Sequence, residues 1–198
     1  MEKTEPQKLV DRANLVIIAA GINVWLTPMF LFWGTAFGPM KPFSYPNAET
    51  APHFPGFLFW LGLSFLPCLL PRSYDRPGTV ASARRLYGSL GILFFKRIAP
   101  NGDLVSRLVR RRYPGYRVLR GRTDLPRFLE GTRSGERGHL VLLLMGLFTA
   151  VYAIRIGWYR WAILLTLGNV VFNLYPVMLQ RYNRARVRII PEATGTTR

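Results

Sequence analysis

Apolar residues in this chain gather into four blocks that are nearly free of charge. The blocks cover residues 15–37, 54–70, 139–154 and 158–179. In a soluble domain the apolar positions recur periodically along amphipathic elements, whereas charge-free runs of about 20 residues are typical of membrane-spanning helices. We therefore predict an all-α membrane protein with four transmembrane helices, forming a single integral membrane domain over residues 1–198.

Lysine and arginine lie almost entirely on one side of these predicted spans. The N-terminal tail holds 3, residues 71–138 hold 16 and the C-terminal tail holds 5, so 24 of the 27 share one side. Only Lys41, Arg155 and Arg160 fall on the other side. Because positively charged segments favour the cytoplasm, we expect a multi-pass protein of the cell membrane. Its N- and C-termini are predicted to be cytoplasmic, with an outer loop over residues 38–53.

The composition is strongly basic, with a formal net charge of +17 from 27 Lys and Arg against 10 Asp and Glu. Such a balance suits either nucleic acid or anionic lipid as a partner. The apolar blocks favour membrane lipids, and no soluble nucleic-acid-binding motif is recognisable, so we predict no nucleic acid partner. The one cysteine, Cys68, excludes a disulfide within the chain. The sequence leaves the oligomeric state open.

Residues 71–138, between the second and third spans, are predicted to form a basic, partly helical cytoplasmic loop. Residues 86–98 are apolar but too short to span a bilayer, which suits an interfacial or re-entrant helix. Residues 104–112 form a predicted short basic helix that ends in three arginines, Arg110 to Arg112. These arginines suit lipid phosphates, or alternatively an acidic group of a substrate.

A carboxylate and an imidazole stand at the cytoplasmic start of the third span. Glu136 and His139 are three residues apart and share a face if this segment is helical. A neighbouring carboxylate can orient an imidazole and raise its basicity, so His139 is a candidate general base. Alternatively, both residues simply begin a helix at the membrane surface. We predict no metal, because a di-metal bundle needs further carboxylates and no predicted span contains Asp or Glu.

A polar stripe follows the fourth span and leaves the membrane with it. Asn169, Asn173, Pro176, Gln180 and Arg184 are spaced by four, three, four and four residues, which places them on one helical face. Intramembrane asparagine is costly unless it faces protein or a cavity. The stripe therefore predicts a polar pocket with cationic donors. Helix–helix contacts and a positively charged anchor are the alternative.

Three segments resemble a known family. They are the run Gln180-Arg181-Tyr182-Asn183-Arg184-Ala185-Arg186 with the preceding Asn173 and Pro176, the segment Tyr87-Gly88 to Phe95-Lys96-Arg97 and Pro100, and Thr132-Arg133 with Glu136 and His139. Together they resemble the glycosyl-4,4'-diaponeurosporenoate acyltransferase family over about residues 86 to 186. The first span and the outer loop show no such resemblance.

The resemblance implies transfer of a fatty acyl group to a sugar hydroxyl of a glycosylated carotenoid or similar lipidic acceptor. The donor would be acyl-CoA or a similar co-substrate, with no cofactor. His139 would be the catalytic base, oriented by Glu136. The implied substrate-binding residues are Asn173, Gln180, Arg181, Tyr182, Asn183, Arg184, Arg186, Lys96 and Arg97. Of these, Asn173, Gln180 or Tyr182 would donate to the oxyanion or the sugar, and Lys96, Arg97, Arg181 and Arg184 would hold phosphates of the donor.

Two other functions compete with this one. The main alternative is a non-enzymatic membrane protein that binds anionic lipid or serves as an assembly partner. It accounts for the basic loop and the polar stripe but requires neither Glu136 nor His139. A small transporter is disfavoured, because the predicted spans carry no carboxylate that would couple ions.

Overall fold

The computed structural model describes residues 4–37, 54–71, 74, 86–119 and 121–187. All regular elements in these ranges are helices, which confirms the predicted all-α class. The chain divides into two compact units, and each is described by itself. Unit 1 takes residues 1–17, 71–136 and 175–198, and unit 2 takes residues 18–70 and 137–174. The single membrane domain stays a prediction, and the predicted outer loop lies outside the described residues.

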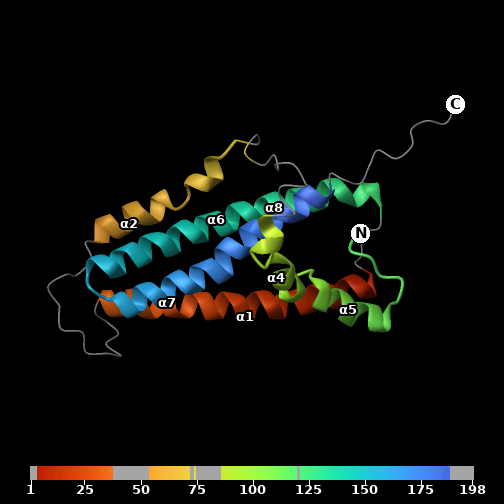
Figure 1. Cartoon of the computed structure of the whole chain (residues 1–198), viewed down its shortest axis with the longest axis horizontal. Helices are drawn as coiled ribbons and strands as arrows, with labels where there is room; N and C mark the ends of the chain where they lie inside the picture. The colour runs from red at the N-terminus through yellow and green to blue at the C-terminus, as the bar shows by residue number, and fades with distance from the viewer. Residues whose placement is uncertain (1–3, 38–53, 72–73, 75–85, 120, 188–198) are drawn as a thin grey trace. The chain divides into compact units, whose positions relative to one another are not determined.

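Among the described residues, three helices are long and apolar enough to cross a membrane (Figure 1). They are α1 (Glu5–Ala36), α6 (Leu125–Arg155) and a third helix, Tyr159–Val187, that consists of α7 (Tyr159–Asn169), the π-helical segment η5 (Val170–Leu174) and α8 (Tyr175–Val187). They contain the first, third and fourth predicted spans. Each extends past its apolar block, because backbone hydrogen bonding continues through charged residues that also favour helix. Residues 125–138, predicted as loop, are therefore the beginning of α6.

The second apolar block does not form a long helix. Instead of one helix over residues 54–70, the structure has α2 (Phe54–Leu63) followed by the 3-10 turn η2 (Leu66–Leu69). Pro67 lacks the backbone N–H that would bind the carbonyl of Leu63, so the α-helix ends there. Ten helical residues span about 15 Å, roughly half of a bilayer core. The structure therefore does not confirm a fourth crossing.

The basic loop contains more breaks than predicted. Residues 86–89 and α4 (Ile92–Ile98) replace the single helix expected over residues 86–98. Gly91 separates them with a left-handed φ of 73°, which glycine adopts without steric cost. Further along, α5 (Asp103–Arg112) covers the segment predicted as a short basic helix, and the short 3-10 turn η4 (Arg122–Asp124) precedes α6.

Two small apolar clusters hold unit 1 together. In the first, α4 packs against α8, and Ile92 is fully buried among side chains that include Leu179 and Tyr182. In the second, the beginning of α1 packs against α5, and the cluster includes Val10 and the buried Val109. These clusters fix α4, α5 and α8 around the polar residues described below.

An aromatic cluster forms the core of unit 2, where α1, α6 and α7 lie side by side (Figure 1). Phe32 is fully buried, and four aromatic rings meet it edge-on with centroids 5.2–6.2 Å away. A tight turn follows Arg155. Gly157, with φ 77°, ends α6, and the N–H of Trp158 binds the carbonyl of Ala153 at 2.8 Å in a Schellman arrangement.

Candidate functional site

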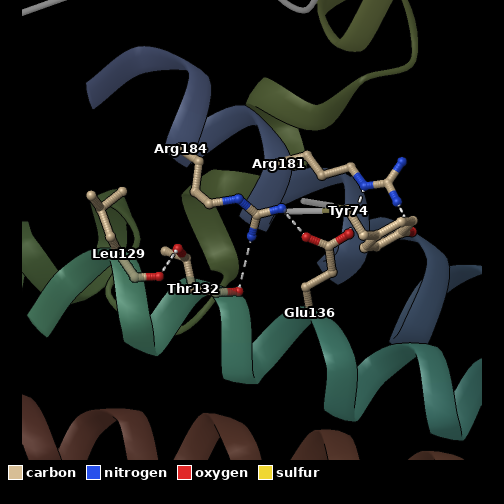
Figure 2. A network of polar contacts seen from close by, with 6 residues as sticks. All are labelled: Tyr74, Leu129, Thr132, Glu136, Arg181 and Arg184. Carbon is tan, nitrogen blue, oxygen red and sulfur yellow. Dashed lines mark hydrogen bonds and ion pairs between the residues drawn. The ribbon is translucent and has the colours of Figure 1, made fainter. Parts of the chain in front are cut away.

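A buried carboxylate binds two arginines in unit 1 (Figure 2). Glu136, on α6, is fully buried, and its Oε1 accepts from Nε of Arg181 at 2.6 Å. Its other oxygen accepts from Nη2 of Arg184, which is only 3% exposed. Arg184 also donates to the carbonyl of Thr132 at 3.2 Å, and Arg181 donates to the hydroxyl of Tyr74. We call these five residues the Glu136 network.

The Glu136 network changes the roles expected for its members. Both carboxylate oxygens of Glu136 bind guanidinium groups, so this carboxylate has partners other than the imidazole it was predicted to orient. Arg184 is enclosed by its contacts and cannot also hold a free phosphate without giving them up. Buried charges require such pairing, because an uncompensated ion in a low-dielectric interior is strongly destabilising. The network carries two positive charges against one negative charge.

His139 belongs to a second polar group, in unit 2. Its Nδ1 lies 3.4 Å from Oδ1 of Asn173, which is 1% exposed. Asn173 donates to Oδ1 of Asn169 at 2.8 Å, and Asn169 donates to the carbonyl of Leu143 at 2.9 Å. In the alternative assignment of the Asn173 amide, with oxygen and nitrogen exchanged, its oxygen instead accepts from Nε1 of Trp25 at 3.0 Å. The predicted polar stripe thus faces protein, as its cost in a membrane requires.

A local break in the helical pattern explains where this imidazole binds. His139 also forms a hydrogen bond with the backbone of Phe172, inside the π-helical segment η5. In an α-helix the carbonyl of Phe172 would accept from residue 176, but Pro176 has no N–H to donate. That carbonyl is therefore left for another donor. Single-turn π-helical segments occur often at functional sites.

Close helix contact in unit 2 depends on a glycine that sequence reasoning missed. A Cβ added to Gly146, on α6, would lie 2.6 Å from Cγ of Asn169, which is closer than non-bonded carbons approach. Only glycine therefore lets Asn169 reach the carbonyl of Leu143. A glycine inside an apolar block is the one signal available in the sequence, and small residues at such positions are typical of close helix packing in membranes.

The other predicted substrate-binding residues lie in four separate places, all within unit 1. Lys96, Asn183 and Arg186 line a pocket. Gln180 packs against α6, where its Nε2 would be 3.4 Å from a Cβ on Gly135. Tyr182 is 6% exposed in the apolar cluster around Ile92, and Arg97 is exposed outside that pocket.

No group of three or more His, Cys, Asp or Glu residues lies close enough to hold a metal within the described part of the chain. The residues described above offer amide, imidazole, hydroxyl and guanidinium groups instead. Such groups can move a proton, bind hydroxyl groups and hold anions.

A family model described as glycosyl-4,4'-diaponeurosporenoate acyltransferase matches residues 71–192. The chain belongs to this family. The family match confirms the resemblance seen over residues 86–186 and covers α4, α5, α6, α7 and α8. The family's name implies an acyltransferase of carotenoid synthesis. No curated protein and no solved structure matches the chain.

Proposed function

We propose that the chain is a membrane acyltransferase that transfers a fatty acyl group to a sugar hydroxyl of a glycosylated carotenoid or similar lipidic acceptor. The family match carries this proposal, because residues 71–192 include both the Glu136 network and His139 with its contacts. An acceptor with a polar sugar and an apolar tail suits polar residues placed on long apolar helices.

In this reaction His139 is the general base. It takes the proton of the sugar hydroxyl while the hydroxyl oxygen attacks the carbonyl carbon of the acyl thioester. The carbon–sulfur bond then breaks, and the leaving thiolate takes the proton from the imidazolium. The contacts with Asn173 and Phe172 support this role, since they hold the ring in one orientation. The co-substrate is acyl-CoA or a similar donor, and the reaction needs no cofactor.

We assign Glu136 a different role from the one its spacing suggested. Its contacts favour a counter-ion that fixes Arg181 and Arg184, rather than a group that orients the imidazole. The position of both arginines, and with it the packing of α8 on the beginning of α6, then depends on this one carboxylate.

For the membrane, we propose a multi-pass protein of the cell membrane with both termini in the cytoplasm and lipids as its surroundings. The distribution of charge supports this, since 24 of 27 Lys and Arg would face the cytoplasm. The arrangement requires residues 54–70 to cross as a fourth span, because three crossings would place the termini on opposite sides. The 3-10 turn η2 lengthens this segment beyond α2 alone.

A non-enzymatic lipid-binding protein remains a second candidate, favoured by one observation on α4. Leu93, Phe94 and Ile98 are exposed there, beside the cations Lys96 and Arg97. Apolar side chains next to cations are typical of helices that lie at an anionic membrane surface. An enzyme could have this feature too, so an acyl-transfer assay is needed to distinguish an acyltransferase from a lipid-binding protein.

The test is acyl transfer by purified protein in lipid nanodiscs, given labelled acyl-CoA and a glycosylated carotenoid. Wild type should transfer label to the acceptor, and His139→Ala should lose nearly all of this activity while inserting into membranes normally. Glu130→Gln, at an exposed position on the same helix, serves as the insertion control. Full activity in His139→Ala would show that His139 is not the general base. If the wild-type protein labels no glycosylated lipid, the result favours the lipid-binding alternative.

A further inference from the structure

Unit 1 contains a pocket of about 580 Å³ that the sequence did not reveal. Its wall is formed by the turn after α4, by α5, by the segment before η4, by the beginning of α6 and by α8. The lining residues are Lys96, Pro100, Asn101, Gly102, Asp103, Ser106, Arg107, Arg110, Val118, Leu119, Phe128, Leu179, Asn183, Arg186 and Val187. Its size lies within the range of about 300–1,000 Å³ typical of ligand sites.

The polar side of this pocket is strongly cationic. Lys96, Arg107, Arg110 and Arg186 face a single carboxylate, that of Asp103. Asp103 accepts from Nζ of Lys96 at 3.3 Å, which compensates at most one of the four positive charges. Four cations from three separate helices converge on one concave surface, which selects for an anion.

Contacts outside the pocket hold two of these cations in place. Arg110 donates from Nε to the carbonyl of Tyr116 at 3.3 Å, which leaves its terminal NH₂ groups available to a ligand. The guanidinium of Arg186 lies over the ring of the buried Tyr182, 5.7 Å from its centroid. Guanidinium groups held in this way lose little freedom when they bind a phosphate, and they can bind it with two hydrogen bonds.

The turn after α4 is fixed by its own contacts. Asn101, with φ 58°, exchanges two hydrogen bonds with Asn14 of α1, each 2.8 Å long. A Cβ on Gly102 would lie 2.1 Å from the carbonyl of Lys96, so only glycine fits there. The turn therefore fixes the start of α5, the helix that carries Ser106 and Arg107.

The other side of the pocket is apolar. Val118, Leu119 and Phe128 line it from the segment before α6 and from α6 itself, and Leu179 lines it from α8. A ligand that fills the pocket therefore has a phosphate-bearing part and an apolar or aromatic part next to it.

We propose that this pocket binds the phosphate groups of such an amphiphilic ligand through Lys96, Arg107, Arg110 and Arg186. The identity of the ligand rests on the proposed function, under which the ligand is the nucleotide part of an acyl-CoA donor. Of the predicted phosphate-binding residues, only Lys96 lines this pocket, since Arg97 lies outside it and Arg181 and Arg184 bind Glu136. Arg107, Arg110 and Arg186 take their places. The headgroup of a phospholipid offers the same chemistry and is the other source.

The test measures binding of coenzyme A, without an acyl chain, to the full-length protein in nanodiscs of neutral lipid by titration calorimetry. Arg110→Gln should weaken binding by roughly tenfold, the usual effect of losing one charge-assisted hydrogen bond. Arg127→Gln is the matched control, because it removes one exposed cation of α6 that does not line the pocket and should leave affinity unchanged. If both variants lose the same affinity for coenzyme A, the effect comes from the overall positive charge of the protein and the proposal is overturned.

A second arm separates the two sources of phosphate. Vesicles of neutral lipid with and without phosphatidic acid compete with coenzyme A for the wild-type protein. If vesicles with phosphatidic acid compete with coenzyme A, and Arg110→Gln abolishes this competition, the ligand is a lipid headgroup. If coenzyme A binds and the vesicles do not compete, the ligand is the free donor. Binding of neither ligand overturns the phosphate site. This binding assay does not depend on acyl transfer. A protein that binds coenzyme A through Arg110 but transfers no acyl group would therefore refute the proposed function and still support the phosphate-binding pocket.

Discussion

The Glu136 network makes a quantitative prediction about stability. Replacing Glu136 by glutamine keeps the shape of the side chain but removes the negative charge from between two guanidinium groups. Arg181 is about one-third exposed and can turn toward solvent, whereas Arg184 is 3% exposed and cannot. Leaving one charge buried without its partner costs about 3–5 kcal/mol. For a chain of this length, each kcal/mol lowers Tm by about 2–4 °C, so we expect a decrease of about 6–20 °C.

Thermal unfolding in detergent, followed by fluorescence-detected size exclusion, measures this decrease. The matched control is Glu130→Gln, the same substitution on the same helix. Glu130 is exposed and pairs with Arg133 at 3.6 Å, so its loss should cost at most about 1 kcal/mol. The double variant Glu136→Gln with Arg184→Met should lose less than the sum of the single variants, because the two residues are in direct contact. If Glu136→Gln unfolds at the same temperature as Glu130→Gln, the network does not stabilise the fold.

Three further predictions concern helix packing, the imidazole and the membrane. Gly146→Ala should destabilise the protein by about 1–3 kcal/mol, because the added Cβ would overlap Asn169. Gly131→Ala, which has open space on the same helix, should be neutral or stabilising. Equal melting temperatures for the two variants would refute this prediction. Pro176→Ala restores a backbone N–H that competes with His139 for the carbonyl of Phe172. The imidazole then loses one hydrogen bond, so kcat should fall about 2–10-fold. An unchanged kcat would show that this contact does not contribute to catalysis. Reporters fused to the two termini should both report the cytoplasm, and opposite sides would mean three crossings.

The apolar pattern predicted the long helices well and failed where backbone hydrogen bonding matters more than composition. Residues 54–70 are as apolar as the other blocks, yet Pro67 ends α2 after ten residues. A hydropathy count does not register one missing N–H. In the opposite direction, residues 125–138 are too polar to look like a span, but nothing in them interrupts a helix, and α6 runs through them.

Within the candidate site, the sequence indicated which residues face protein better than it indicated which residues meet. The polar stripe placed Asn169 and Asn173 correctly on the protein-facing side of their helix. It gave no reason to pair Glu136 with Arg181 and Arg184, 45 and 48 residues later. Charge balance offered one hint that spacing did not. Glu136 is the only carboxylate between residues 131 and 191, while the C-terminal helix carries several arginines.

The distribution of those arginines bears on the choice between an enzyme and a lipid anchor. An anchor requires only that cations reach the membrane surface, and exposed residues such as Arg97 meet that requirement. It gives no reason to bury Arg184 against a carboxylate, or to hold Arg110 and Arg186 by separate contacts around a pocket with an apolar wall. Each of these arrangements restricts side chains that a surface anchor could leave free. Cations with fixed positions are of use when the ligand itself must be held in one position, which a group-transfer reaction requires and lipid attraction does not.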